Sequence, residues 1–261
     1  MRFFKDVKKY LPYSIYAAKS ALRAEVAGSY LNWLWWIFNP ICMMFIYTFI
    51  FGIVFKASEE YFPVFVFIGL TLWDYFSRTI TSSVSLVKAK KSIITKIYLP
   101  KFVLLFSEIF VNLFKMLISF GVIVVMLFVL RVPVSLNVIW IIPIIIVETI
   151  LIFGLSCFIM HFGVFVEDLK NIVKIIMRFI FYGTGIFWNV ETRMAEYPIV
   201  EKVLTHWNPL GYILVNGRKA LIAQTRPELL WLLFWFAAGI ALSFFGVMLI
   251  YRSENSYTKV I

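Results

Sequence analysis

The sequence predicts an all-α polytopic membrane protein with six transmembrane helices, an N-terminal amphipathic interface helix, and re-entrant or interfacial helices before the last span. Hydrophobic residues make up 62% of the 261 positions and charged residues only 15%, whereas soluble domains are about half apolar and about a quarter charged. Apolar runs of about 20 residues, long enough to cross the hydrocarbon core, recur along the chain. Lys and Arg gather in the segments between these runs, as expected at cytoplasmic loops.

The chain begins with a segment that differs from the spans. Residues 1–31 are too charged to cross a membrane, yet their apolar side chains recur at helical spacing, so we expect an amphipathic helix in the cytoplasmic interface. A solvated tail is the alternative. The spans follow at residues 33–55, 62–80, 103–130, 138–162, 172–188 and 229–251. The whole chain is therefore expected to form one membrane domain.

Two segments are neither spans nor simple loops. Residues 82–99 are basic and carry apolar side chains at helical spacing, which predicts a surface helix that offers a face to a partner. A bare connecting loop is the alternative. Residues 190–226 mix aromatic residues, prolines and charges, so they are too interrupted to cross and too apolar to be free loop. We expect an outer re-entrant or interfacial region there.

The formal net charge of +11 has a topological explanation. Nearly all basic residues outside residues 190–226 fall on one side of the six-span arrangement, which predicts a multi-pass protein with both termini in the cytoplasm. No basic stripe with interleaved exposed aromatics remains once the spans are removed. Nucleic-acid binding is therefore not expected.

The sequence offers no catalytic or cofactor site. It contains no Gly-x-x-x-x-Gly-Lys-Ser/Thr segment, so any ATP and Mg must be bound by a partner chain. His161 and His206 lie far apart, and Cys42 and Cys157 fall inside apolar runs. We therefore expect no metal site, no nucleophilic relay and no redox chemistry in this chain.

Charged and aromatic side chains inside the spans have two interpretations each. Glu108, Lys115 and Glu148 could relay ions or lock helices together, and we favour locking. Aromatic rings could form a slide for sugars or a lipid-facing belt. The candidate channel-lining residues are Tyr30, Trp33, Trp36, Phe45, Phe181 and Trp188.

Four short segments, in this order and spacing, give the chain a family resemblance. They are Leu34-Trp35-Trp36-Ile37-Phe38-Asn39-Pro40, Lys96-Ile97-Tyr98-Leu99-Pro100-Lys101, Phe165-Val166-Glu167-Asp168-Leu169-Lys170-Asn171 and Asn208-Pro209-Leu210-Gly211-Tyr212. With them, nearly the whole chain resembles the membrane subunit of ABC-2-type exporters of the polysaccharide and teichoic-acid branch. Wall teichoic acid exporter permeases are the most similar, and O-antigen exporter permeases come next.

The resemblance implies an assembly of two copies of this chain with two copies of a separate ABC ATPase, which binds ATP and Mg. Residues 82–99 would be the coupling helix, and Glu167 and Asp168 would lie near a second contact. The residues implied in ATPase coupling are Ser85, Lys88, Lys90, Lys91, Ser92, Lys96, Glu167 and Asp168. The family often has Arg-Asp where this chain has Glu167-Asp168, so the family's charge pairing does not carry over to Glu167.

The implied substrate is a glycopolymer on a polyprenyl-diphosphate lipid, and we favour wall teichoic acid over O-antigen polysaccharide. Lys19, Arg23 and Arg78 could attract its diphosphate at the inner entrance, although cytoplasmic positive charge explains them equally. A permease for a small amphiphile or drug is an alternative within transport. A polyprenyl-lipid membrane transferase and a structural scaffold are alternatives of other classes, and scattered acidic residues weigh against the transferase.

Overall fold

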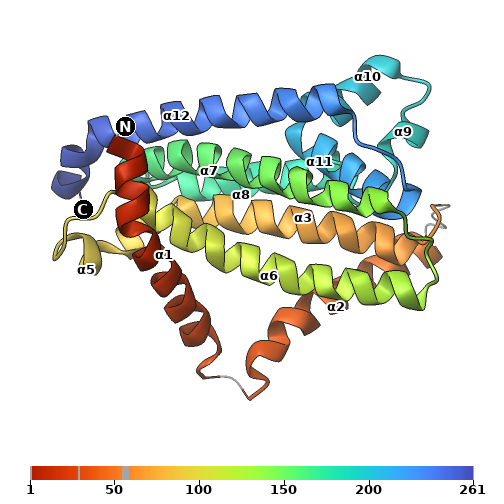
Figure 1. The fold of residues 1–261 in the computed structure, drawn as a ribbon, viewed down its shortest axis with the longest axis horizontal. Coiled ribbons are helices and arrows are strands. Elements are labelled where there is room, and N and C mark those ends of the chain that lie inside the picture. The colour runs from red at the N-terminus through yellow and green to blue at the C-terminus, as the bar shows by residue number, and fades with distance from the viewer. Residues whose placement is uncertain (1, 29, 55–58, 261) are drawn as a thin grey trace.

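The computed structural model describes residues 2–28, 30–54 and 59–260, and these contain helices and turns but no strand (Figure 1). The all-α fold class is thereby confirmed. In chain order the elements are α1 (Arg2–Val26), η1 (Asn32–Leu34), α2 (Trp35–Tyr47), the π-helical η2 (Thr48–Val54), α3 (Phe62–Ser83), α4 (Leu86–Ala89), α5 (Lys91–Ile94), α6 (Phe102–Val129), η3 (Leu136–Trp140), α7 (Ile141–Phe165), α8 (Leu169–Gly183), α9 (Val190–Arg193), α10 (Pro198–Lys202), η4 (Val203–Trp207), α11 (Pro209–Arg218), η5 (Lys219–Ala223) and α12 (Leu229–Val260).

The long helices form a bundle whose two ends differ. Helices α3, α6, α7 and α12 run along the long axis of the molecule, whereas α1 and α2 form a V whose apex projects from the bundle (Figure 1). The start of α1, the end of α12, and α4 and α5 gather at one end, which we call the terminal end. Helices α9 and α10 lie at the opposite end, which we call the distal end.

Helix α3 is the centre of the bundle. It packs against α2, α6, α7, α8 and α11, and Val64, Phe67 and Leu72 have no exposed surface. Protein surrounds this helix on most sides, yet it carries Asp74 and Arg78, whose side chains are nearly half exposed. The charged pair of α3 therefore sits on a firmly packed helix, on a side that stays partly open.

Four helical segments of the described chain are long and apolar enough to cross a membrane. They are Trp35–Val54, Phe102–Val129, Leu136–Phe165 and Leu229–Glu254. Helices α3 and α8, the other two expected spans, fall outside this group: α3 carries Asp74 and Arg78, and the 15 residues of α8 extend only roughly 22 Å. The count of six spans stays a prediction.

Element boundaries differ from the expected ones where the backbone turns. Residues 82–99 hold two short helices, α4 and α5, rather than one, because Lys90 between them leaves the helical conformation at φ −102° and ψ 19°. Helix α8 ends at Gly183 instead of reaching residue 188, because Gly185 adopts φ +76° and turns the chain. Helix α12 continues past residue 251 to Val260.

Helices α7 and α12 make the most extensive helix pair of the described chain, and glycines let them approach. A Cβ at Gly154 of α7 would lie 2.8 Å from Leu242 Cβ and 2.9 Å from the Ser243 backbone nitrogen. A Cβ at Gly246 of α12 would lie 2.6 Å from Cys157 Cβ. Small residues at helix contacts are how membrane helices pack closely without a hydrophobic driving force.

We expect Gly154→Ala to lower the free energy of unfolding by about 1–3 kcal/mol, because the added methyl group forces α7 and α12 apart. Titration with a denaturing detergent in mixed micelles measures the change. Gly121→Ala in α6 is the matched control, since a Cβ there meets nothing within 4 Å and Ala favours helix over Gly by up to about 1 kcal/mol. Equal effects of the two substitutions would contradict the packing argument.

Candidate functional site

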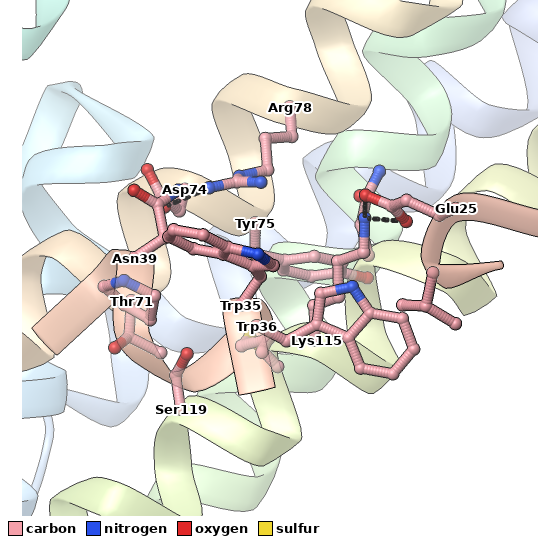
Figure 2. A pocket seen from close by; sticks show the side chains of 14 residues that line it. Glu25, Trp35, Trp36, Asn39, Thr71, Asp74, Tyr75, Arg78, Lys115 and Ser119 are labelled. Atoms are coloured by element: carbon pink, nitrogen blue, oxygen red, sulfur yellow. Dashed lines mark hydrogen bonds and ion pairs between the residues drawn. The ribbon is translucent and has the colours of Figure 1, made fainter. Parts of the chain in front are cut away.

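A cavity of about 310 Å³ lies where α1, α2, α3 and α6 meet (Figure 2). The V of α1 and α2 forms one wall, and the buried helix α3 and the middle of α6 form the other. Its lining residues are Glu25, Val26, Trp35, Trp36, Asn39, Pro40, Thr71, Asp74, Tyr75, Arg78, Asn112, Lys115, Met116 and Ser119. We call this space the elbow cavity.

Two ion pairs face the elbow cavity (Figure 2). Arg78 Nη2 lies 3.0 Å from Asp74 Oδ2, one turn away on α3. Lys115 Nζ of α6 lies 2.6 Å from Glu25 Oε2 in the last turn of α1. The first pair is thus local to one helix, whereas the second joins two helices, as expected of an intramembrane charge that locks the bundle.

The remaining wall is polar at one side and aromatic at another. Thr71, Asn112 and Ser119 are buried, and the hydroxyl of Thr71 has no hydrogen-bond partner among the described residues. Asn112 Nδ2 donates to Thr79 Oγ1 at 3.1 Å. The indoles of Trp35 and Trp36 lie beside these groups (Figure 2). Cations, hydroxyls and ring faces together suit an anionic group attached to a sugar.

A second, larger cavity of about 810 Å³ lies on the other side of α2, between α2, α3 and α8. Asn39, Pro40, Asp74 and Arg78 line both cavities, so the two adjoin at the first turns of α2. The other lining residues of the second cavity are Met43, Tyr47, Leu70, Trp73, Ser77, Thr81, Lys174, Met177, Arg178, Phe181 and Tyr182. Its wall is therefore aromatic with cations on α8.

The structure separates the predicted channel and entrance residues. Trp36 and Phe181 line the first and second cavity respectively, and Arg78 lines both. The others lie outside these walls. Tyr30, Trp33 and Phe45 are exposed, Trp188 is half-buried, and Lys19 and Arg23 are exposed on α1. Sequence reasoning missed the cavity-lining rings of Tyr47, Trp73 and Tyr182, because their positions carry no signal beyond aromatic character.

The predicted coupling residues lie at the terminal end. Lys91, Ser92, Lys96 and Asp168 are exposed, while Ser85, Lys88 and Lys90 are half-buried. Lys88 Nζ lies 3.3 Å from Glu167 Oε1, so the two predicted contact regions touch. A Cβ at Gly163 of α7 would overlap the Val84 carbonyl oxygen, which shows how closely the backbone before α4 approaches α7.

A hydrogen-bonded network joins three segments at the same end. Arg2 Nη2 donates to the Tyr98 hydroxyl at 2.7 Å, and that hydroxyl donates to Glu254 Oε2 at 3.0 Å. The Tyr251 hydroxyl donates to Asp6 Oδ2 at 2.6 Å. Burial raises the pKa of the Tyr98 phenol, and the hydrogen bond to Glu254 adds to this. Helix α1, the turn after α5 and α12 are therefore tied together.

Arg218 organises the distal end. Its guanidinium donates to the carbonyls of Phe65 at 3.1 Å, Gly185 at 2.8 Å and Ile186 at 2.6 Å. It also stacks 3.5 Å from the Phe65 ring centroid and is 6% exposed. A cavity of about 380 Å³ beside it is lined by charged residues of both signs. Arg218 thus fixes α11 to α3 and to the turn after α8.

Histidines and acidic residues form no metal site in the described residues. His161 Nδ1 lies 2.8 Å from the Tyr257 hydroxyl, and His206 Nε2 lies 2.8 Å from Glu228 Oε2. Glu148 of α7 is completely buried, and its two carboxyl oxygens have no hydrogen-bond partner in the part of the chain that the structure describes. Unlike Lys115, Glu148 therefore makes no locking pair there.

No family model matches the chain. Curated proteins do: an O-antigen export system permease protein RfbA of Klebsiella pneumoniae is 28% identical over 244 residues, covering 92% of this chain and 91% of that protein. A second K. pneumoniae protein of the same name is 30% identical over 201 residues, covering 76% and 75%. The Myxococcus xanthus protein of that name is 22% identical over 228 residues, covering 87% of each.

We expect Glu148→Gln to raise the free energy of unfolding by about 1–3 kcal/mol, because an unpaired amide carries no charge and costs less to bury than an ionisable carboxyl group without a partner. Unfolding in mixed micelles measures the change. Glu108→Gln serves as the comparison, since Glu108 is only partly buried and the effect should be smaller. A less stable Glu148→Gln variant would mean that the carboxyl group makes an interaction in the membrane that favours it.

Proposed function

The chain belongs to the ABC-2-type exporter permeases, and from this premise we propose that it moves a polyprenyl-diphosphate-linked polysaccharide across the bacterial cytoplasmic membrane. The observation that carries the proposal is the 30% identity over three quarters of a relative's length. We expected wall teichoic acid from the sequence, but each relative named above exports O-antigen, so we propose an O-antigen-type glycan as the cargo.

The chemistry of the elbow cavity supports such a cargo. A lipid-linked glycan carries a diphosphate, sugar hydroxyls and C–H faces, and the cavity presents Lys115 and Arg78, the Thr71 hydroxyl, and two indoles. We assign the diphosphate to the cations and the first sugar to Trp35 and Trp36. Lys19 and Arg23, exposed on α1, collect the headgroup at the membrane surface before it enters.

The second cavity supports a route for the sugars beyond the headgroup. In a homodimer of this chain, the α2–α3–α8 face of each copy lines one side of a shared channel, and Tyr47, Trp73 and Phe181 offer ring faces to passing sugars. Tyr30, Trp33, Phe45 and Trp188 complete the lining in the assembled pair. Aromatic rings bind sugars weakly and do not require one particular alignment of the polymer, so the polymer can slide past them.

The partner is an ABC ATPase, present in two copies, that binds and hydrolyses ATP with Mg. Its groove receives α4 and α5 with the turn that follows: Lys91 and Ser92 are exposed on α5, and Lys96 is exposed in the turn. Closure of the ATPase dimer displaces these helices, and the contacts of Lys88 with Glu167 and of Val84 with Gly163 pass the displacement to α7. Both termini then lie in the cytoplasm beside the ATPases.

The test is co-expression with candidate ABC ATPases of the same organism in a strain that lacks this permease. We expect the ATPase to co-purify, and its turnover in nanodiscs to respond to a polyprenyl-diphosphate-linked glycan. Replacing Lys90, Lys91 and Ser92 together should abolish that response, whereas Lys202→Gln at the distal end should preserve it. A chain that purifies without any ATPase and leaves surface polysaccharide unchanged when deleted would overturn the proposal.

We expect Arg78→Gln to separate function from stability. Its pair with Asp74 is nearly half exposed, so the free energy of unfolding should change by at most about 1 kcal/mol. Export, measured as surface polysaccharide per cell, should fall about tenfold or more, because the diphosphate loses a charge-assisted contact. Arg78→Lys keeps the charge and should retain part of the activity. Full export by the Arg78→Gln variant would show that Arg78 has no role in binding the diphosphate at the entrance.

A further inference from the structure

The contact between Glu25 and Lys115 is the only one of the two cavity pairs that joins different helices. Glu25 lies in the last turn of α1, and Lys115 lies near the middle of α6, 90 residues later. Asp74 and Arg78, by contrast, share one face of α3 and stay together whatever α1 does. The position of the end of α1 therefore depends on whether Lys115 stays paired with Glu25.

The two partners differ in what they lose when they separate. The Lys115 side chain is 17% exposed on an apolar helix, so its ammonium group needs an anion beside it. The Glu25 side chain is 47% exposed and can return to water at little cost. Another anion can therefore replace Glu25 at Lys115, as long as it enters the elbow cavity.

The elbow cavity offers an anion more polar groups than the carboxylate of Glu25 uses. Thr71 is 4% exposed and its hydroxyl has no hydrogen-bond partner among the described residues, yet the residue lines the same space as both ion pairs. Figure 2 shows both pairs facing one cavity, with Thr71 and Ser119 beside them. A diphosphate carries more charge and more acceptor oxygens than one carboxylate, so it can engage Lys115, Arg78 and Thr71 together.

We propose that Glu25 holds the phosphate position of the elbow cavity before substrate arrives, and that a lipid diphosphate displaces it from Lys115 and thereby releases the end of α1 from α6. This inference rests on the proposed function and adds a substrate-operated latch to it. The remainder of α1 stays anchored, because Ser14 Oγ still donates to the Val103 carbonyl at 3.2 Å and Arg2 still contacts Tyr98. Only the end of α1 beside the cavity moves.

Binding and helix position are measured on the full chain in nanodiscs with polyprenyl diphosphate as the probe. Removing the internal competitor with Glu25→Gln should tighten binding about fivefold, whereas Lys115→Gln should weaken it about tenfold. Nitroxide labels at Ala24 and Leu117, in a background with Cys42 and Cys157 replaced, report the separation of α1 and α6. We expect the distance to lengthen on adding diphosphate to the otherwise unaltered chain, and to be long already in Glu25→Gln.

The matched controls are Glu191→Gln and Lys219→Gln, which break a Lys–Glu contact between α9 and η5 without touching the elbow cavity. They should leave affinity and label distance unchanged. Phosphatidylglycerol tests the alternative source of the anion: equal displacement by this lipid would overturn the diphosphate assignment. Thermal unfolding of every variant separates loss of binding from loss of fold.

The latch and the exporter function fail in different ways. If the unaltered chain binds polyprenyl diphosphate but Glu25→Gln binds no more tightly and α1 does not move, the latch is wrong and the exporter proposal stands. If the unaltered chain binds no diphosphate lipid and cells lacking it keep their surface polysaccharide, the exporter proposal itself is wrong.

Discussion

The structure depends on the burial of α3 among five other helices. A membrane helix surrounded by protein has no lipid to match, so it can bring carboxylate, guanidinium and hydroxyl groups to the depth of the bilayer at low cost. Arg218 fixes the start of α3 through the Phe65 carbonyl, and Tyr75 donates to Thr149 Oγ1 of α7 at 3.0 Å farther along. The elbow cavity has a firm wall because α3 cannot easily shift.

The opposite wall of the elbow cavity, formed by α1 and α2, is less enclosed by other helices than α3. Helices α1 and α2 meet in a V that projects from the bundle, and much of their surface is exposed. Most of α1 packs against α6, with Phe3 and Val7 against the core and Ala18 buried, whereas its last turn is tied to α6 by the Glu25–Lys115 pair. Rigid and adjustable walls thus face each other across one cavity, which is the arrangement that a site needs when its occupant is large and must enter from the side.

Hydropathy predicted the long apolar spans well, and it predicted the segments that are surrounded by protein less well. Four segments are apolar over a length that matches the hydrocarbon core of a membrane: Trp35–Val54, Phe102–Val129, Leu136–Phe165 and Leu229–Glu254. Helix α3 has a mixed polar and apolar sequence, because a helix buried among other helices does not have to be apolar on every side. The break between α4 and α5 was not predictable, since it depends on the backbone at Lys90 and not on the apolar spacing that both helices retain.

The candidate site was predictable only where its partners are close in sequence. Asp74 and Arg78 are four residues apart, so one helix face brings them together. Glu25 and Lys115 meet because of the angle between α1 and α6, which no local pattern encodes. The same holds for the adjoining cavities: Trp36 and Phe181 are two aromatic residues among many until the fold places them at a wall.

The network at the terminal end has a consequence for biosynthesis. Arg2 leaves the ribosome 252 residues before its partner Glu254. At about 5–20 residues per second, roughly 13–50 s of synthesis separate them. The contact between Ser14 and Val103 forms well before that. Helix α1 is therefore made before α12 but fully secured only once α12 is made, and during insertion Arg2 must wait at the membrane surface for Glu254.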